Sequence, residues 1–218
     1  KGIVLCISPW NFPLAITLGQ IAAALAAGNT VISKPSEHTP ILAFEAINLF
    51  LDQGLPEDAI HLFLGKGDIA QAIILNQPID LVAFTGSLKT AKMIHQSLSS
   101  KAGKIIPLIA ETGGLNSMIV DSSALLERAC DDIIRSAFNS AGQRCSALRL
   151  LLIHQEIYPQ LISMLKGAMK DLTIGAPSDL NVDVGPIIDT HSLKKLENYL
   201  DQMKSNGHAI FQTSKEGI

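Results

Sequence analysis

The sequence predicts an α/β protein: a Rossmann-like parallel sheet with helices on both faces, followed by the first part of a second α/β domain. Three observations predict this class. Short apolar runs alternate with longer apolar stretches of helical length as far as about residue 110. Hydrophobic residues make up 47% of the 218 positions, enough for a sizeable buried core. The paired glycines Gly113 and Gly114 then interrupt the alternation and permit an unusual backbone path.

In the first half, five short apolar runs are predicted to be strands, and four longer segments between them to be helices. Residues 14–27 are rich in alanine and apolar nearly all round, which indicates a buried helix that Gly28 would end. Gly54 and Pro56 would end the next helix. The expected strands are residues 3–8, 30–33, 60–64, 81–84 and 105–110, and the expected helices are residues 14–27, 41–51, 69–75 and 88–98.

The alternation of predicted strands and helices changes after about residue 110. We therefore expect a domain boundary at residues 112–114, with domains of residues 1–112 and 113–218. Ser122 and Ser123 are expected to cap a long helix, because serine hydroxyls accept hydrogen bonds from the first backbone N–H groups of a helix. The abrupt ends of the chain indicate a piece of a longer protein. The expected elements here are strands at residues 117–120 and 148–154 and helices at residues 124–139 and 158–170.

Composition excludes several classes of function. The net charge is −3 and the basic residues are scattered, so no basic stripe for nucleic acid is expected. No apolar run reaches the roughly 18 residues that span a bilayer, and no secretory signal is visible. Three cysteines without a matched pair indicate a reducing, cytoplasmic compartment. Six dispersed histidines without metal-ligand spacing predict no metal site.

Cys145 is the candidate nucleophile. It lies in the run Gly142-Gln143-Arg144-Cys145-Ser146, whose small and polar residues indicate a loop. A buried, inert thiol is the commoner role of a cysteine, and Cys6 in an apolar strand and Cys130 in a helix fit that role. The thiolate form of a cysteine attacks carbonyl carbon. The positive charge of Arg144 favours this thiolate form over the neutral thiol.

Glu111 and Asn11 are candidate partners for that thiol. Glu111 follows an apolar strand, and a carboxylate at the carboxyl end of a parallel strand faces the crevice where such sheets bind ligands. Its commonplace alternatives are helix capping and a salt bridge; as a general base it would activate water. Asn11 lies between Pro9 and Pro13, where a simple turn is the ordinary reading. Its amide could instead stabilise an oxyanion, together with the backbone N–H of Cys145.

Several turns after strands could hold a dinucleotide. Glu37, in Lys34-Pro35-Ser36-Glu37, could accept hydrogen bonds from ribose hydroxyls and repel a 2′-phosphate, which favours NAD over NADP. Gly65-Lys66-Gly67-Asp68-Ile69-Ala70 matches G-x-G-x-x-A, but after the third strand rather than the first. The hydroxyls and the helix start at Phe84-Thr85-Gly86-Ser87 suit a pyrophosphate. Both segments could equally be tight turns.

Five motifs occur in order along the chain: P-W-N-F-P, K-P-x-E, F-T-G-S, E-x-G-G and G-Q-x-C. Together they resemble the aldehyde dehydrogenase superfamily over essentially all 218 residues. Long runs at residues 5–13, 110–125 and 140–149 are similar to the L-glutamate γ-semialdehyde (1-pyrroline-5-carboxylate) dehydrogenase domain of bifunctional bacterial proline utilisation proteins.

That resemblance implies NAD-dependent oxidation of L-glutamate γ-semialdehyde to L-glutamate in proline catabolism, by way of a cysteine thioester. It implies that Cys145 is the nucleophile, Glu111 the base and Asn11 the oxyanion donor. It further implies an NAD-binding domain at 1–112 and a catalytic domain at 113–218. The residues expected at the cofactor are Ser8, Pro9, Trp10, Lys34, Glu37, Gly67, Gly86, Ser87, Thr112 and Gly113, and those expected at the substrate are Phe12, Arg144 and Ser146.

The resemblance also implies partners for the whole protein. A small aldehyde is the expected substrate and a homo-oligomer the expected assembly, with the parent protein cytoplasmic or peripheral at the inner membrane. FAD is expected only if the parent carries a proline dehydrogenase domain. Two alternatives stay open: a dehydrogenase for another small semialdehyde, such as succinate semialdehyde, or a nucleotide-binding module without catalysis for this chain alone.

Overall fold

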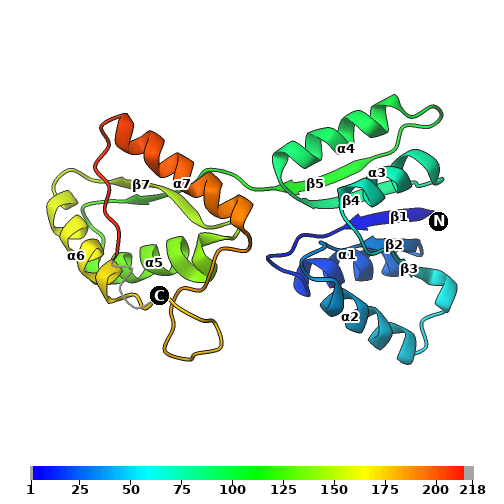
Figure 1. The fold of residues 1–218 in the computed structure, drawn as a ribbon, viewed down its shortest axis with the longest axis horizontal. Coiled ribbons are helices and arrows are strands. Elements are labelled where there is room, and N and C mark those ends of the chain that lie inside the picture. Colours follow the sequence, from blue (N-terminus) through cyan, green and yellow to red (C-terminus); the bar gives the residue numbers. More distant parts are fainter. Residues whose placement is uncertain (1, 214–218) are drawn as a thin grey trace. The chain divides into compact units, whose positions relative to one another are not determined.

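The computed structural model describes residues 2–213, and the chain divides between Gly113 and Gly114 into two compact units (Figure 1). Each unit contains a parallel sheet with its own helices and its own buried core. No helix within residues 2–213 is long and apolar enough to cross a membrane.

The first unit is built on one five-stranded parallel sheet. Its strands lie in the order β3-β2-β1-β4-β5, so β1 is central and the connection after β3 crosses back to place β4 beside β1. This reversal of direction makes a switch point between β1 and β4, where sheets of this kind bind ligands outside the carboxyl ends of their strands. The strands are β1 (Ile3–Ile7), β2 (Thr30–Lys34), β3 (Ile60–Leu62), β4 (Leu81–Gly86) and β5 (Leu108–Thr112).

Helices cover both faces of this sheet (Figure 1). Alternate residues of β1 point to opposite faces: Val4 and Cys6 pack in one core with Ile21 and Ile47, and Leu5 packs in the other. The first core lies against α1 (Ala15–Ala26) and α2 (Pro40–Asp52), and the second against α3 (Gly67–Asn76) and α4 (Leu88–Ser100); a short 3₁₀ turn, η1 (Glu57–Ala59), precedes β3. The predicted fold class, a parallel sheet with helices on both faces, is confirmed.

The position of β5 corrects the predicted strand at residues 105–110. The strand begins at Leu108 and continues through Glu111 and Thr112. Pro107 has no N–H to donate to the ladder, and its carbonyl accepts from Val82 N just before the strand begins. Glu111 therefore lies inside the strand rather than after it.

The second unit contains a two-stranded parallel sheet with helices α5 and α6 packed on one face. Val120 and Leu148 of the sheet pack with Cys130 and Ile133 of α5 and with the fully buried Leu161 of α6. The elements are β6 (Asn116–Val120), α5 (Leu126–Phe138), the 3₁₀ segment η2 (Asn139–Gly142), β7 (Leu148–Ile153), α6 (Tyr158–Asp171) and α7 (Thr190–Ser205).

The expected serine cap of α5 is wrong. The helix begins at Leu126, and its N-cap residue, Leu125, makes no side-chain cap. Ser123 instead donates its hydroxyl to Asp121 at 3.0 Å, and the backbone N–H groups of Ser122 and Ser123 also bond this carboxylate, which lowers the pKa of Asp121. The short polar side chain of Asp121 thus closes a turn before the helix can start.

Helix α7 was not predicted from the sequence. Asp189 caps it, because its carboxylate accepts from Ser192 N at 2.6 Å. An aspartate followed by Leu193, Leu196 and Tyr199 at helical spacing was the available signal. All three side chains are exposed in the described chain, so the helix contributes little to the core.

Candidate active site

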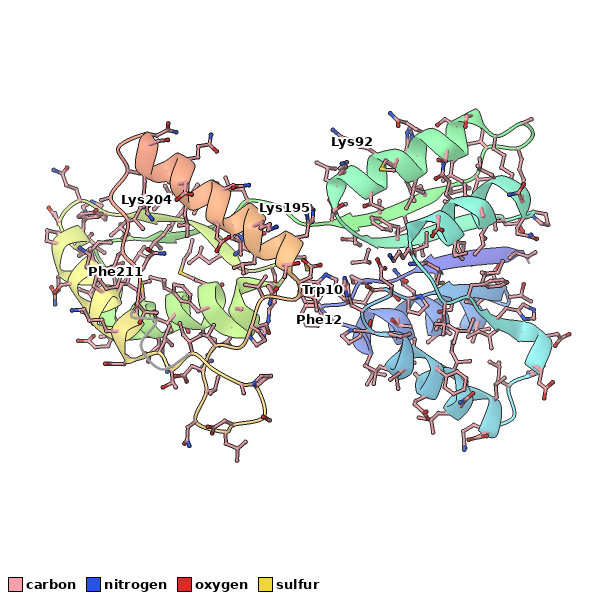
Figure 2. All side chains as sticks on the ribbon, viewed as in Figure 1. Trp10, Phe12, Lys92, Lys195, Lys204 and Phe211 are labelled. Carbon is pink, nitrogen blue, oxygen red and sulfur yellow. The ribbon has the colours of Figure 1, made fainter. Side chains whose placement is uncertain are left out.

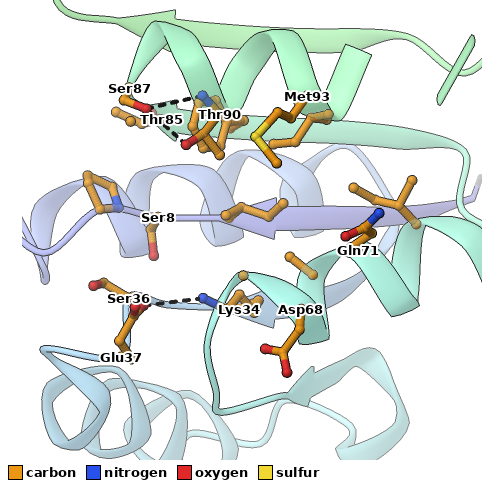
Figure 3. Close-up of a pocket in the computed structure, with 18 of the residues that line it drawn as sticks. Ser8, Lys34, Ser36, Glu37, Asp68, Gln71, Thr85, Ser87, Thr90 and Met93 are labelled. Carbon is orange, nitrogen blue, oxygen red and sulfur yellow. Dashed lines mark hydrogen bonds and ion pairs between the residues drawn. The ribbon is translucent and has the colours of Figure 1, made fainter. Parts of the chain in front are cut away.

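A cavity of about 600 Å³ opens at the carboxyl ends of β1, β2 and β4, on the face of the sheet that α3 and α4 cover. This volume is within the range of small-molecule sites. The lining residues come from the ends of β1, β2 and β4, from the segments that follow these strands, and from α3 and α4 (Figure 3). The polar residues that line it are Ser8, Lys34, Ser36, Glu37, Asp68, Gln71, Thr85, Ser87, Thr90 and Ser97.

Lys34 is the buried cation of this cavity. Only 5% of its side chain is exposed, and its Nζ lies 3.8 Å from Glu37 Oε2, whose own side chain is 41% exposed. Burial lowers the pKa of Lys34, and the negative charges of Glu37 and Asp68 partly oppose that change. A cation withdrawn from water beside an open cavity is suited to bind the hydroxyls or phosphates of a ligand.

Replacement of Lys34 by methionine is expected to raise the free energy of unfolding, by about 1 kcal/mol. Because the pKa of Lys34 is lower in the folded chain than its ordinary 10.5, the unfolded chain binds this proton more tightly. The free energy of unfolding therefore rises with pH between the lowered pKa and 10.5, and Lys34→Met should flatten that rise. Urea midpoints measured from neutral to alkaline pH test this. Lys92→Met, at an exposed position of α4, should leave the pH dependence in place, and a large loss of stability in Lys34→Met would contradict the argument.

Two hydroxyls at the cavity are oriented from the opposite face of the sheet by α1. Thr17 Oγ1 donates to Ser8 Oγ at 2.7 Å, and Gln20 Nε2 donates to Thr85 Oγ1 at 3.2 Å. Since each hydroxyl oxygen accepts a bond from α1, its own proton is available to another acceptor. Thr17 and Gln20 thereby hold the Ser8 and Thr85 side chains at the ends of β1 and β4.

A third hydroxyl at the cavity belongs to Ser87, the N-cap residue of α4. Its Oγ accepts from Thr90 N at 3.1 Å and lies 2.9 Å from Thr90 Oγ1 (Figure 3). At the preceding position, Gly86, a Cβ would lie 2.6 Å from the ring of Phe84, so a side chain there requires the ring to move. The cap and the glycine together fix the turn between β4 and α4 beside the cavity.

Most residues expected at the cofactor line this cavity. Trp10 does so from the loop between β1 and α1, where Figure 2 labels it together with Phe12. Thr112 and Gly113 do not line it, because β5 is the edge strand beyond β4. Sequence reasoning gave no role to the lining residues Gln71, Thr90, Met93 and Ser97, and it missed Thr17 and Gln20 behind the sheet. The expected residues that line the cavity are Ser8, Pro9, Trp10, Lys34, Glu37, Gly67, Gly86 and Ser87.

Glu111 belongs to the other face of the sheet. It is paired in register with Thr85, and residues paired across parallel strands point to the same face. Thr85 bonds Gln20 of α1, so Glu111 lies on the α1 side, where its side chain is exposed. Asn11 and Phe12 precede α1 in the loop after β1 and are half-buried. The carboxylate and the amide are thus both carried by elements on or next to the α1 side of the first unit.

Cys145 lies in the second unit, exposed, three residues after an unusual turn. Ser140, Ala141 and Gly142 have φ values of 56°, 55° and 66°. This left-handed conformation is unfavourable for serine and alanine. At Gly142 a Cβ would lie 2.7 Å from the Ala137 carbonyl oxygen, so only glycine fits. Such a turn persists only where its surroundings hold it.

Three segments outside the Cys145 loop hold it: β6 and β7 through side chains, and residues 186–188 through their backbone. Asn116 Nδ2, at the start of β6, donates to the carbonyls of Cys145 at 2.7 Å and Ala147 at 2.9 Å. Arg149 of β7 donates to the Gly142 carbonyl. Gln143 Nε2 donates to Pro186 O at 3.2 Å, and its Oε1 accepts from Ile188 N at 2.9 Å. Asn116 and Arg149 had no assigned role from the sequence.

The other residues expected at the substrate lie in the same loop. Arg144 Nε donates to Ser140 Oγ at 3.1 Å, so this side chain turns back over the left-handed turn. Ser146 is exposed next to Cys145. The two remaining thiols, unlike that of Cys145, are withdrawn from water. Burial raises the pKa of Cys6 to about 12 and also raises the pKa of Cys130. Both are buried, as expected for structural cysteines.

A scan against family models matches residues 1–217 to the aldehyde dehydrogenase family, so the chain belongs to that family. This confirms the expectation from the five motifs. The chain is 47% identical over 219 residues to the bifunctional protein PutA of Escherichia coli (strain K12), and the match covers 99% of this chain and 17% of that protein. It is 34% identical to the 1-pyrroline-5-carboxylate dehydrogenase of Bacillus cytotoxicus, covering 96% of this chain and 41% of that protein.

Among solved structures, a mutant of Bradyrhizobium japonicum proline utilization A (PutA) superposes with a TM-score of 0.92 at 48% identity. The match covers 94% of this chain and 21% of that one. The chain therefore spans about a fifth of the PutA proteins to which it is similar, and about two fifths of the single dehydrogenase named above.

Proposed function

We propose that this chain is part of an NAD-dependent dehydrogenase that oxidises L-glutamate γ-semialdehyde, the open form of 1-pyrroline-5-carboxylate, to L-glutamate. The observation that carries the proposal is the cavity at the switch point of the first unit, with the buried Lys34 beside Glu37. Membership of the aldehyde dehydrogenase family and similarity to PutA support the reaction and the substrate.

The residues of the cavity fit a dinucleotide. Lys34 and the hydroxyls of Ser8 and Ser87 are donors for ribose oxygens and phosphates, and Glu37 is an acceptor for ribose hydroxyls. The backbone N–H groups that begin α3 and α4 favour negative charge at the same edge of the sheet. When bound, NAD supplies the hydride acceptor that oxidation of an aldehyde requires.

The proposed chemistry of the chain's own groups is acyl transfer through sulfur. The Cys145 thiolate forms a C–S bond to the aldehyde carbon, and the Asn11 amide and the Cys145 backbone N–H donate hydrogen bonds to the resulting alkoxide. After oxidation, Cys145 holds the acyl group as a thioester. Glu111 then takes a proton from the water that attacks this thioester, glutamate leaves, and the thiolate is released.

In this proposal the first unit binds the cofactor and the second carries the nucleophile. The protein acts on a small aldehyde in the cytoplasm, and as a whole it forms a homo-oligomer. FAD belongs to the proposal only if a proline dehydrogenase domain is joined to this chain.

The full-length protein that contains this chain is expected to produce NADH from 1-pyrroline-5-carboxylate at least about tenfold faster, at low substrate, than from succinate semialdehyde. The reason is that an enzyme shaped for one substrate stabilises the corresponding transition state by an additional 1–3 kcal/mol or so. Initial rates with each substrate, at matched NAD, measure this ratio.

A reversed preference would keep the dehydrogenase and overturn the substrate. Absence of NADH with both substrates, from folded protein that binds NAD in calorimetry, would favour a nucleotide-binding module without catalysis. Absence of NAD binding would overturn the proposal as a whole.

A further inference from the structure

Two carboxylates from different elements lie beside Lys34 in the cavity of the first unit. Glu37 is in the loop between β2 and α2, and Asp68 is in the first turn of α3. In the close-up of Figure 3 they lie on either side of Lys34. Both negative charges act on the Lys34 ammonium, which carries only one positive charge. The formal charge of this group of three side chains is therefore −1.

The carboxylate of Asp68 is not used by the fold for a hydrogen bond. No hydrogen bond from residues 2–213 reaches the Asp68 carboxylate. Lys66, the N-cap residue of α3, makes no side-chain cap. An acidic residue in a first helical turn is favourable by a few tenths of a kcal/mol up to about 1 kcal/mol, and this would be its ordinary role. Its position on the wall of the cavity, within electrostatic reach of Lys34, indicates a second one.

We propose that Asp68 is a specificity-determining residue that, together with Glu37, excludes the 2′-phosphate of NADP and so selects NAD; this rests on the proposed binding of NAD. In sheets of this kind the ribose next to the adenine lies beyond the end of the second strand, beside the acidic residue that follows it. Here that position is the end of β2, where Lys34 and Glu37 lie.

Charge decides between the two cofactors at this position. A neutral 2′-hydroxyl donates a hydrogen bond to a carboxylate, whereas a phosphate monoester brings about −1.5 to −2 charges. Lys34 alone would attract that phosphate, but its charge is already exceeded by the two carboxylates. Removal of the Asp68 charge makes the group of three neutral, and removal of both acidic charges leaves Lys34 as a phosphate-binding cation.

The test is calorimetric titration of the full-length protein with NAD and, separately, with NADP. In Asp68→Asn, the ratio of the NADP to the NAD dissociation constant is expected to fall by about tenfold, mainly through tighter NADP. It should fall further in the double variant Glu37→Gln/Asp68→Asn. The effect of Asp68→Asn should shrink in high salt, because exposed charges are screened. The matched control is Asp52→Asn, which removes the same charge from an exposed position of α2 that does not line the cavity.

An unchanged ratio in Asp68→Asn, in protein that binds NAD, would overturn the inference and leave the proposed function intact. Equal weakening of both cofactors, with a lower thermal midpoint, would assign Asp68 to the stability of α3 and overturn the inference as well. If the unmodified protein binds neither cofactor, the proposed function fails and this inference with it.

Discussion

Replacement of Cys145 by alanine is expected to reduce aldehyde oxidation by at least about 10⁴-fold while NAD binding is retained. Without the thiol no C–S bond can form, and loss of an attacking nucleophile removes nearly all of the rate in enzymes that use one. The measurement is NADH production in single-turnover and steady-state experiments, with NAD affinity followed by calorimetry.

The matched control for this variant is Cys130→Ala. Burial raises the pKa of the Cys130 thiol and removes it from water, so it cannot serve as a nucleophile. Its loss should leave the turnover of folded protein unchanged. Iodoacetamide at neutral pH should label Cys145 before Cys6 or Cys130, because Cys145 alone of the three is exposed. Substantial turnover in Cys145→Ala would exclude the thioester route.

Replacement of Glu111 by glutamine is expected to separate the two halves of the reaction. The Cys145 thiolate can still accept the acyl group, so one equivalent of NADH should appear in a burst. The following steady state should be slower by about 10²–10⁴-fold, because water then attacks the thioester without a base. Rapid-mixing fluorescence of NADH measures both phases.

An added strong nucleophile such as hydroxylamine should restore turnover in Glu111→Gln, because it attacks the thioester without help from a base. The control is Glu45→Gln, an exposed position of α2, which should show the ordinary progress curve. Steady-state turnover at the normal rate in Glu111→Gln would remove Glu111 from the role of base. Absence of the burst would place the defect before acyl transfer.

The parallel sheet of the first unit was predictable because its strands are covered on both faces. A strand such as Val4-Leu5-Cys6-Ile7 must then be apolar throughout, and this composition is visible locally without knowledge of its neighbours. The cavity residues after β1, β2 and β4 were predictable for a related reason. The carboxyl ends of parallel strands lie at one edge, so turns far apart in sequence meet there.

The surroundings of Cys145 were not predictable from its neighbours in sequence. Ser140 and Ala141 have no sequence preference for the left-handed conformation that they adopt. The bonds that hold the loop come from Asn116 and from residues near Pro186, and side-chain bonds over such separations leave no local pattern. Likewise, the face on which Glu111 lies follows from its register with Thr85, which sequence does not reveal.

The bonds between Gln143 and residues 186–188 can form only after that later segment has been synthesised. Gln143 bonds the backbone of Pro186 and Ile188, 43 and 45 residues later, and the left-handed turn beside it is unfavourable on its own. A ribosome delivers those residues after the loop itself, and the exit tunnel delays them further. The nascent protein therefore displays a thiol in a loose loop for the time that this segment takes to emerge. During that interval the loop lacks the two bonds that Gln143 makes, so the surroundings of Cys145 are completed only after residues 186–188 have emerged.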